Sequence, residues 1–155
     1  MADQFTKSII VGAGVETVYD LWANFENFPH FMKNIYAVTK TGERTSHWIM
    51  QGPLGTRVEW DAETTRLEPN TRIAWNSRDG GDIKTSGQAV FTALPNGTTQ
   101  VTVTLQYVPP AGMLGQAIAD LFEKPEERLE EDLVRFKAYA EEIAGRRGRT
   151  RAAAL

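Results

Sequence analysis

The chain has 155 residues, 41% hydrophobic and 24% charged, a composition typical of one soluble globular domain. It contains no cysteine, which excludes disulfides, thiol nucleophiles and cysteine metal sites. Four of the 17 basic residues lie in residues 145–155, which contain no acidic residue. The other 13 basic residues and the 20 acidic residues give residues 1–144 a formal net charge of about −7. An acidic domain of this kind does not suit nucleic-acid binding, which needs clustered Lys and Arg to neutralise phosphates.

The first part of the chain alternates between strand and helix patterns. Residues 4–11 are rich in β-branched side chains and predict a strand, and residues 12–24 place apolar side chains at helical spacing. The stretch NFENFPHFM (24–32) follows, and its Pro29 is predicted to begin a short second helix, where a missing N–H costs nothing.

Six strands joined by short turns come next, over residues 35–41, 44–51, 56–67, 71–77, 84–93 and 98–108. The third of these alternates most clearly, because Val58, Trp60 and Ala62 point to one face while charged residues point to the other. This pattern predicts a sheet with one dry face and one wet face. Asn96-Gly97 is the preferred pair for a type I′ hairpin turn.

A helical tract is predicted from Gly112 to about Ala144, and Pro125 either kinks it or begins a second helix. Its apolar side chains form one stripe: Leu114, Ile118, Phe122, Leu129, Leu133, Phe136, Ala140 and Ile143. These elements predict an α+β fold in which an antiparallel meander is covered by one long helix. A curved sheet need not meet that helix everywhere, and the gap becomes a pocket.

Residues 1–144 are expected to form a single ligand-binding domain, and residues 145–155 a disordered, solubilising tail. The tail arginines would also suit an anionic partner. The opening MADQFTKSII lacks the pattern of a signal peptide, and no stretch approaches the roughly 20 apolar residues of a membrane span. A cytoplasmic location without an integral membrane segment is therefore expected.

Several stretches resemble the bacterial polyketide cyclase/dehydrase-like proteins of the START-like, helix-grip superfamily, which includes birch-pollen-allergen-like proteins. The resemblance covers residues 4–144 and is carried by SIIVGAGVETVYDLWANFENFPHFMKNI, HWIMQGPLGTRVEWDAE, RIAWNS and LFEKPEERLEEDLVRFKAYAEE. It implies a seven-stranded antiparallel sheet gripping the C-terminal helix, a mostly apolar cavity between them, and two short helices between strands one and two that close one end.

Motifs for cofactors, metals and nucleophiles are missing from the sequence. His30 and His47 lie in different elements without a partner histidine nearby, and RDGGD (78–82) fails the calcium-loop pattern. Gly12-Ala13-Gly14 lacks the third glycine of a dinucleotide site. No acid, base and oxyanion donor can be brought together, so we expect no cofactor, no metal and no catalytic residue.

The candidate ligand contacts are large apolar side chains, which equally serve as ordinary core. They are Phe28, Phe31 and Met32 as a gate, Trp48, Met50, Trp60, Trp75, Phe91 and Tyr107 on the sheet, and Leu114, Ile118, Phe122 and Leu129 on the helix. His30 and Arg78 are the polar candidates, although both are more often surface residues, and His47 is expected to face solvent.

The leading interpretation is a protein that binds a small hydrophobic molecule, polyketide-like, isoprenoid or lipid, between sheet and helix. The first alternative is a cyclase or dehydratase acting on a polyketide-like substrate there, which needs a polar residue inside the cavity and would be supported by His30 or Arg78 turned inward. The second is a non-catalytic interaction module with a solid core and a protein partner that the sequence does not identify.

Overall fold

Seven antiparallel strands form one sheet in the order β1-β7-β6-β5-β4-β3-β2. The computed structural model describes residues 3–108 and 122–154. The strands are β1 (Asp3–Val11), β2 (Ile35–Lys40), β3 (Thr45–Gln51), β4 (Arg57–Glu68), β5 (Arg72–Ser77), β6 (Lys84–Leu94) and β7 (Thr98–Val108). The helices are α1 (Val15–Ala23), η1 (Phe25–His30), η2 (Pro53–Gly55), η3 (Pro95–Gly97) and α3 (Pro125–Ala154). The expected fold class, with its seven strands, is confirmed.

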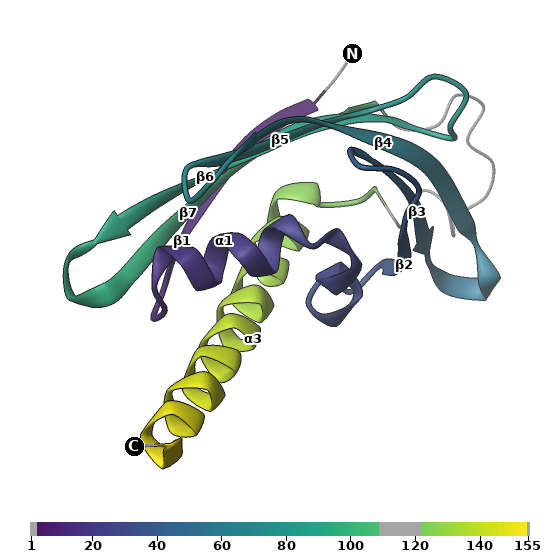
Figure 1. Cartoon of the computed structure of the whole chain (residues 1–155). Helices are drawn as coiled ribbons and strands as arrows, with labels where there is room; N and C mark the ends of the chain where they lie inside the picture. The colour runs from purple at the N-terminus through teal and green to yellow at the C-terminus, as the bar shows by residue number, and fades with distance from the viewer. Residues whose placement is uncertain (1–2, 109–121, 155) are drawn as a thin grey trace.

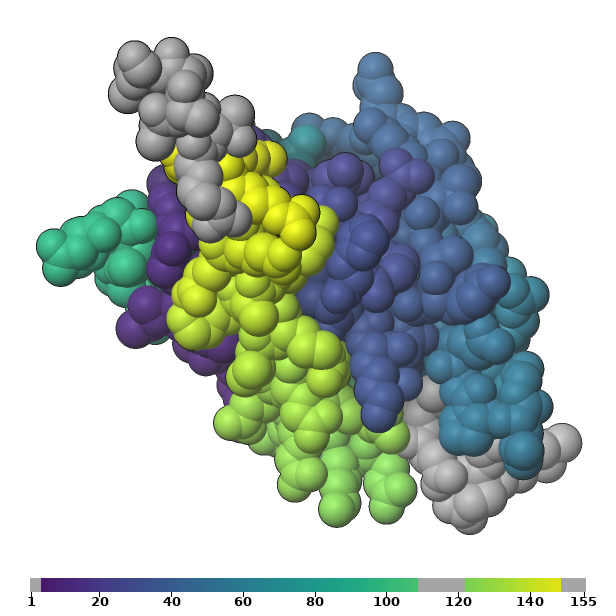
Figure 2. All heavy atoms as spheres, turned by 90° about the horizontal axis from the view of Figure 1, so that it is seen from below, coloured from purple at the N-terminus to yellow at the C-terminus, as the bar shows by residue number. Residues whose placement is uncertain are grey.

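The sheet curves around α3, which crosses its concave side (Figure 1). Two irregularities in strand pairing interrupt the ladder, one between Ile35 and Ala37 and one between Thr64 and Arg66. Such bulges bend and twist a strand. Seen from below, α3 lies between the N-terminal strand and the segment that follows α1 (Figure 2).

The dry face predicted for the sheet is its concave face. Val58, Trp60 and Ala62 of β4 are buried, whereas the charged residues between them are exposed or half-buried. The same alternation holds in β7, where Val101 and Val103 are almost fully buried. The hairpin between β6 and β7 has positive φ at both Asn96 and Gly97, as the central residues of a type I′ turn require.

The C-terminal helix α3 begins at Pro125, directly after Lys124, whose φ of 52° lies in the left-handed region. Pro125 therefore starts a helix, one of the two outcomes that the sequence left open. The expected beginning of the tract at Gly112 lies outside the described residues. The expected end near Ala144 is wrong, because the α3 backbone continues to Ala154 through Arg- and Ala-rich sequence of high helix propensity.

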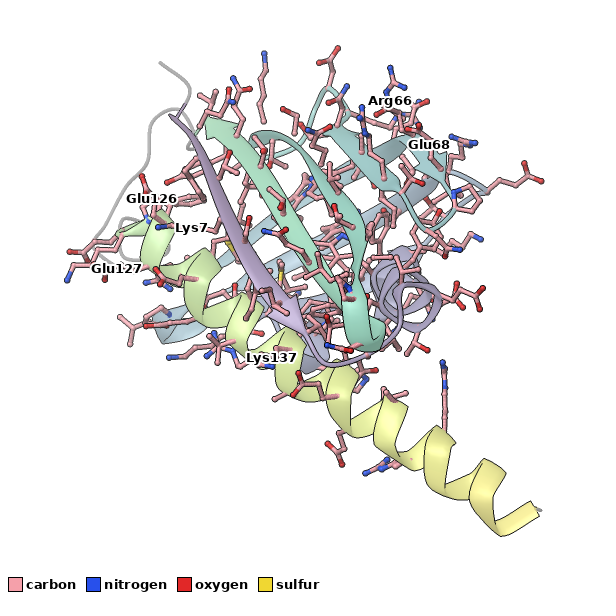
Figure 3. All side chains as sticks on the ribbon, turned by 90° about the vertical axis from the view of Figure 1, so that its left-hand side faces the viewer. Lys7, Arg66, Glu68, Glu126, Glu127 and Lys137 are labelled. Carbon is pink, nitrogen blue, oxygen red and sulfur yellow. The ribbon has the colours of Figure 1, made fainter. Side chains whose placement is uncertain are left out.

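One face of α3 packs on the core, and polar contacts fix the helix at the β1 side. Leu129, Leu133, Phe136 and Ala140 of the predicted stripe are buried. Near the start of α3, Lys7 Nζ of β1 lies 3.7 Å from carboxylate oxygens of both Glu126 and Glu130 (Figure 3). Further along, the Gly12 backbone N–H donates to Glu141 Oε2 at 2.6 Å. The last turns of α3 extend past the sheet (Figure 3). Within the described residues, no helix combines the length and hydropathy needed to cross a membrane.

The short helix after α1 differs from the prediction. Pro29 does not begin it but lies inside η1, a six-residue 3-10 helix that starts at Phe25. Its missing N–H removes one i→i+3 hydrogen bond, which so short a helix tolerates when its aromatic side chains are buried. Phe28 is buried there, and its carbonyl accepts the N–H groups of Phe31 and Met32 at 3.1 and 2.8 Å.

Candidate functional site

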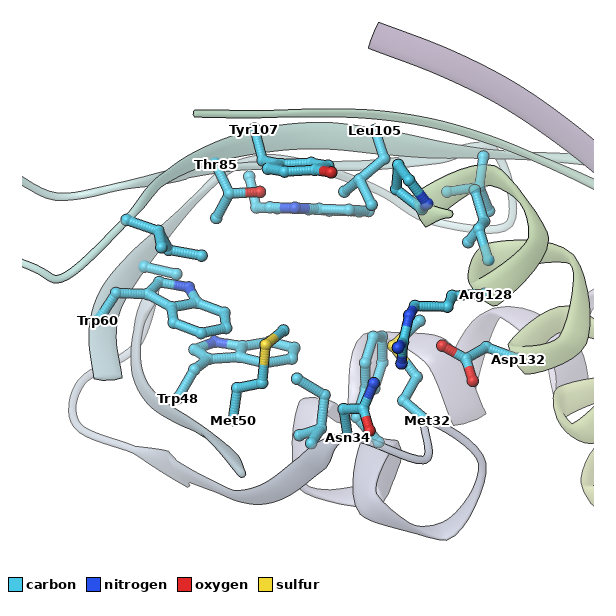
Figure 4. A pocket seen from close by; sticks show the side chains of 18 of the residues that line it. Met32, Asn34, Trp48, Met50, Trp60, Thr85, Leu105, Tyr107, Arg128 and Asp132 are labelled. Carbon is cyan, nitrogen blue, oxygen red and sulfur yellow. The ribbon is translucent and has the colours of Figure 1, made fainter. Parts of the chain in front are cut away.

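A cavity of about 160 Å³ lies between the concave face of the sheet, η1 and α3 (Figure 4). Nine of the predicted ligand contacts line it: Phe28, Met32, Trp48, Met50, Trp60, Trp75, Tyr107, Phe122 and Leu129. The gap between sheet and helix is therefore real, and aromatic rings form much of its wall.

The wall on β3 and β4 is built from two neighbouring tryptophans. Trp48 and Trp60 face each other across the strands, with ring centroids 6.0 Å apart and planes within 13° of parallel. Trp48 Nε1–H donates to Ser46 Oγ at 2.8 Å, which satisfies the buried indole nitrogen. This pairing fixes a flat apolar surface along one side of the cavity.

The η1 helix forms the adjoining wall through edge-to-face ring contacts. The Phe28 ring contacts the rings of Phe25 and Trp48 nearly perpendicularly, at centroid distances of 5.4 and 5.2 Å. Phe25 and Phe28 both line the cavity, so the aromatic stretch after α1 is at once part of the core and part of the cavity wall.

Two predicted contacts lie behind the cavity wall. Phe31 is buried against Phe136, at a ring-centroid distance of 4.9 Å, and does not line the cavity. Phe91 packs on Tyr19 at 5.5 Å and is likewise absent from the lining. Both are buried in the same core as the lining residues, so the hydrophobic pattern alone does not distinguish them from residues that line the cavity. Leu114 and Ile118 lie outside the described residues.

Neither polar candidate points into the cavity. His30 is exposed and stacks on the Tyr139 ring, with centroids 5.4 Å apart and planes at 12°. Arg78 is exposed in the turn after β5, where its backbone N–H donates to the Asp61 carbonyl at 2.7 Å. The lining residues of the cavity include neither.

One end of the cavity is polar, which the sequence pattern did not predict. Asn34, Arg128 and Asp132 line the cavity together with its apolar residues. Arg128 and Asp132 belong to the charged run EERLEED (126–132), and charge alone would place both on the solvent face of the helix. Each directly precedes a buried leucine, Leu129 or Leu133, so a helical projection places both at the border of the apolar stripe. That border position is the signal that would have found them.

Asp132 is held in place by its neighbours. Its Oδ1 atom is ion-paired with Arg135 and accepts the Lys33 backbone N–H at 3.4 Å. Arg135 also donates through Nε to the Phe31 carbonyl at 3.1 Å. Burial raises the pKa of Asp132 above its ordinary value, although the Arg135 and Lys33 hydrogen bonds act in the opposite direction.

A polar groove of about 240 Å³ adjoins this end of the cavity. It shares Asn34, Arg128 and Asp132 with the cavity, and its other lining residues are Lys33, Glu123, Lys124, Glu127, Glu131 and Arg135. The apolar cavity and the polar groove therefore adjoin each other at these three shared residues.

His47 lies on the outer face of the sheet, as expected, with 35% of its side chain exposed. Its Nδ1 and Nε2 atoms lie 2.9 Å from Asp61 Oδ1 and 3.0 Å from Glu59 Oε1. Only the doubly protonated ring donates to both carboxylates. The hydrogen bond to Glu59, followed by that to Asp61, raises the pKa of His47.

Replacing His47 by glutamine is expected to destabilise the protein in a pH-dependent way. Because the folded-state pKa is raised, the stabilisation is fully present below the unfolded pKa of about 6.5 and is lost as pH rises through the folded value. The difference in urea midpoint between wild type and His47→Gln should therefore be larger near pH 5.5 than near pH 9. An equal difference at both values would show that the ring does not act through its charge.

The chain is similar to known proteins over most of its length. The family model described as Polyketide cyclase / dehydrase and lipid transport matches residues 11–134. An uncharacterized 17.2 kDa protein from Streptomyces lincolnensis is 30% identical over 149 residues, covering 96% of this chain and 97% of that protein.

Two solved structures extend the comparison. A protein from Deinococcus radiodurans is 32% identical, with a TM-score of 0.72 over 90% of this chain and 97% of its own. The Zhui aromatase/cyclase from a Streptomyces species is 18% identical, with a TM-score of 0.68 over 95% of this chain and 96% of its own. At that identity the second likeness concerns the fold alone.

Proposed function

Because the chain belongs to the polyketide cyclase/dehydrase and lipid transport family of the START-like helix-grip superfamily, we propose that it binds a small hydrophobic molecule in the cavity under its sheet. The proposed ligand is polyketide-like, isoprenoid or lipid, and the proposed binding domain is residues 1–144. Trp48, Met50 and Trp60 would supply one wall of the site, Phe28 the adjoining wall, and Leu129 a contact from α3.

The observation that carries this proposal is the apolar cavity itself. An apolar cavity of about 150 Å³ in another protein stays dry and takes up benzene, so about 160 Å³ suits a ring-sized group. Burial would contribute about 25 cal/mol for each Å² of apolar surface removed from water, before the costs of association. A larger ligand would extend from the cavity towards the adjoining groove.

The two alternatives have less support. An interaction module with a solid core is disfavoured by the cavity. A cyclase or dehydratase would have to use the polar end of the cavity, because His30 and Arg78 lie on the surface, away from the lining. Binding therefore stands as the primary proposal.

Titration with an uncharged naphthylamine dye tests the proposal. The dye is expected to bind with one saturable site, with a rise in fluorescence and displacement by naphthalene. Leu54→Ala serves as the control and should bind the dye as the wild type does, because Leu54 is 97% exposed and lies outside the cavity lining. Absence of saturable, displaceable binding in the wild type would contradict the proposed function.

A further inference from the structure

The junction between cavity and groove differs from the rest of the site in its chemistry. Asn34, Arg128 and Asp132 converge on one end of the cavity, opposite the tryptophan wall of β3 and β4 (Figure 4). A wholly apolar ligand would leave these polar groups facing apolar surface, which costs free energy. The junction therefore fits a ligand that is apolar along its body and polar at one end.

Two polar groups at this junction, Asp132 Oδ2 and the Asn34 side-chain amide, have no side-chain partner among the described residues. The contacts of the Asp132 carboxylate with Arg135 and the Lys33 N–H both use Oδ1. Within the described chain Oδ2 has no hydrogen bond, and 18% of the side chain is exposed. The Asn34 carbonyl accepts the Gln51 N–H at 2.8 Å, but its side-chain amide has no hydrogen bond to any described residue. The junction thus offers an acceptor from Asp132 and a donor from Asn34.

The surrounding charges do not favour an ionic group. The groove is lined by four basic residues, Lys33, Lys124, Arg128 and Arg135, and four acidic ones, Glu123, Glu127, Glu131 and Asp132. A carboxylate at the junction would meet the Asp132 carboxylate, and an ammonium would meet the guanidinium groups of Arg128 and Arg135. A neutral group that both donates and accepts meets neither repulsion.

We propose that the ligand is a neutral amphiphile with a hydroxyl group at its polar end, donating to Asp132 Oδ2 and accepting from the Asn34 side-chain amide. This inference rests on the proposed function and names the class of ligand for the same cavity. A phenol or an alcohol on a ring-sized apolar body has the required chemistry.

Three probes of the same ring system test this assignment: naphthalene, naphthol and methoxynaphthalene, at neutral pH where a phenol keeps its proton. A hydrogen bond to a charged group predicts that the wild type binds naphthol roughly tenfold more tightly than methoxynaphthalene, which has no donor. In Asp132→Asn this preference should fall below about threefold. In Glu131→Gln, which changes a groove residue outside the cavity lining, the preference should persist.

A second variant keeps the assignment testable if Asp132→Asn folds poorly. Asn34→Ala should weaken both oxygen-bearing probes and leave naphthalene unchanged, because it removes the amide that donates to the probe oxygen and keeps Asp132 in place. Equal wild-type affinity for naphthol and methoxynaphthalene would overturn the inference while leaving the proposed function intact. A naphthol preference that survives in Asp132→Asn would also overturn it, and failure of every probe to bind would count against the proposed function itself.

Discussion

Replacing Trp22 by alanine is expected to lower the free energy of unfolding by about 3–5 kcal/mol, the range for deleting a large aromatic side chain from a core. Trp22 is 0% exposed. Its ring contacts five others, those of Phe28, Phe31, Trp75, Phe91 and Phe136, so α1, η1, the sheet and α3 meet on it. Urea denaturation of the two proteins measures the difference.

Two further variants make this result interpretable. Trp22→Phe should cost less than Trp22→Ala, because it keeps an aromatic ring and removes an indole N–H that is buried without a partner in the described chain. Val134→Ala, at a position 56% exposed on α3, should change stability by no more than about 0.5 kcal/mol. A Trp22→Ala loss as small as that of Val134→Ala would refute the central role of this ring.

Enlarging two buried alanines is expected to have opposite effects on stability. Ala62 on β4 lines the cavity, whereas Ala89 on β6 is buried outside its lining. Ala89→Leu should cost about 1–3 kcal/mol, because the added carbons find no space in a packed core. Ala62→Leu should leave stability unchanged or raise it by up to about 2 kcal/mol, as cavity-filling substitutions commonly do.

Thermal or urea unfolding of both variants gives this comparison directly. The two positions carry the same substitution on neighbouring parts of one sheet, so differences in β propensity largely cancel. Equal, large losses of stability in Ala62→Leu and Ala89→Leu would mean that the space next to Ala62 cannot accept a side chain. That result would contradict the presence of a cavity there.

The sequence predicted the sheet well because its alternation is strong. In β4 and β7 every buried position lies on the same alternating face, so burial of Trp60 or Val103 could be inferred from pattern alone. Boundaries depending on local hydrogen bonding were less predictable. Pro29 suits the first turn of a helix, yet η1 starts four residues earlier, at Phe25, whose ring packs on that of Phe28.

The site was predictable in its apolar part only. Nine predicted side chains line the cavity, but Phe31 and Phe91 belong to the packed layer, because periodicity gives the face of an element and not the depth of a side chain. The positions of Asp132 and Arg128 at the cavity were not predicted, because both side chains are charged. Charged residues are ordinarily assigned to water, and their approach to the cavity depends on how α3 is rotated over the sheet.

The central claim is that ligand binds inside the cavity rather than on the surface, and dye titration of Ala62→Leu tests it most directly. The wild type should bind the uncharged naphthylamine dye at one saturable site, and the folded Ala62→Leu variant should bind it at least about tenfold more weakly, since its side chain occupies the same space. Unchanged dye affinity in a folded Ala62→Leu protein would contradict the account.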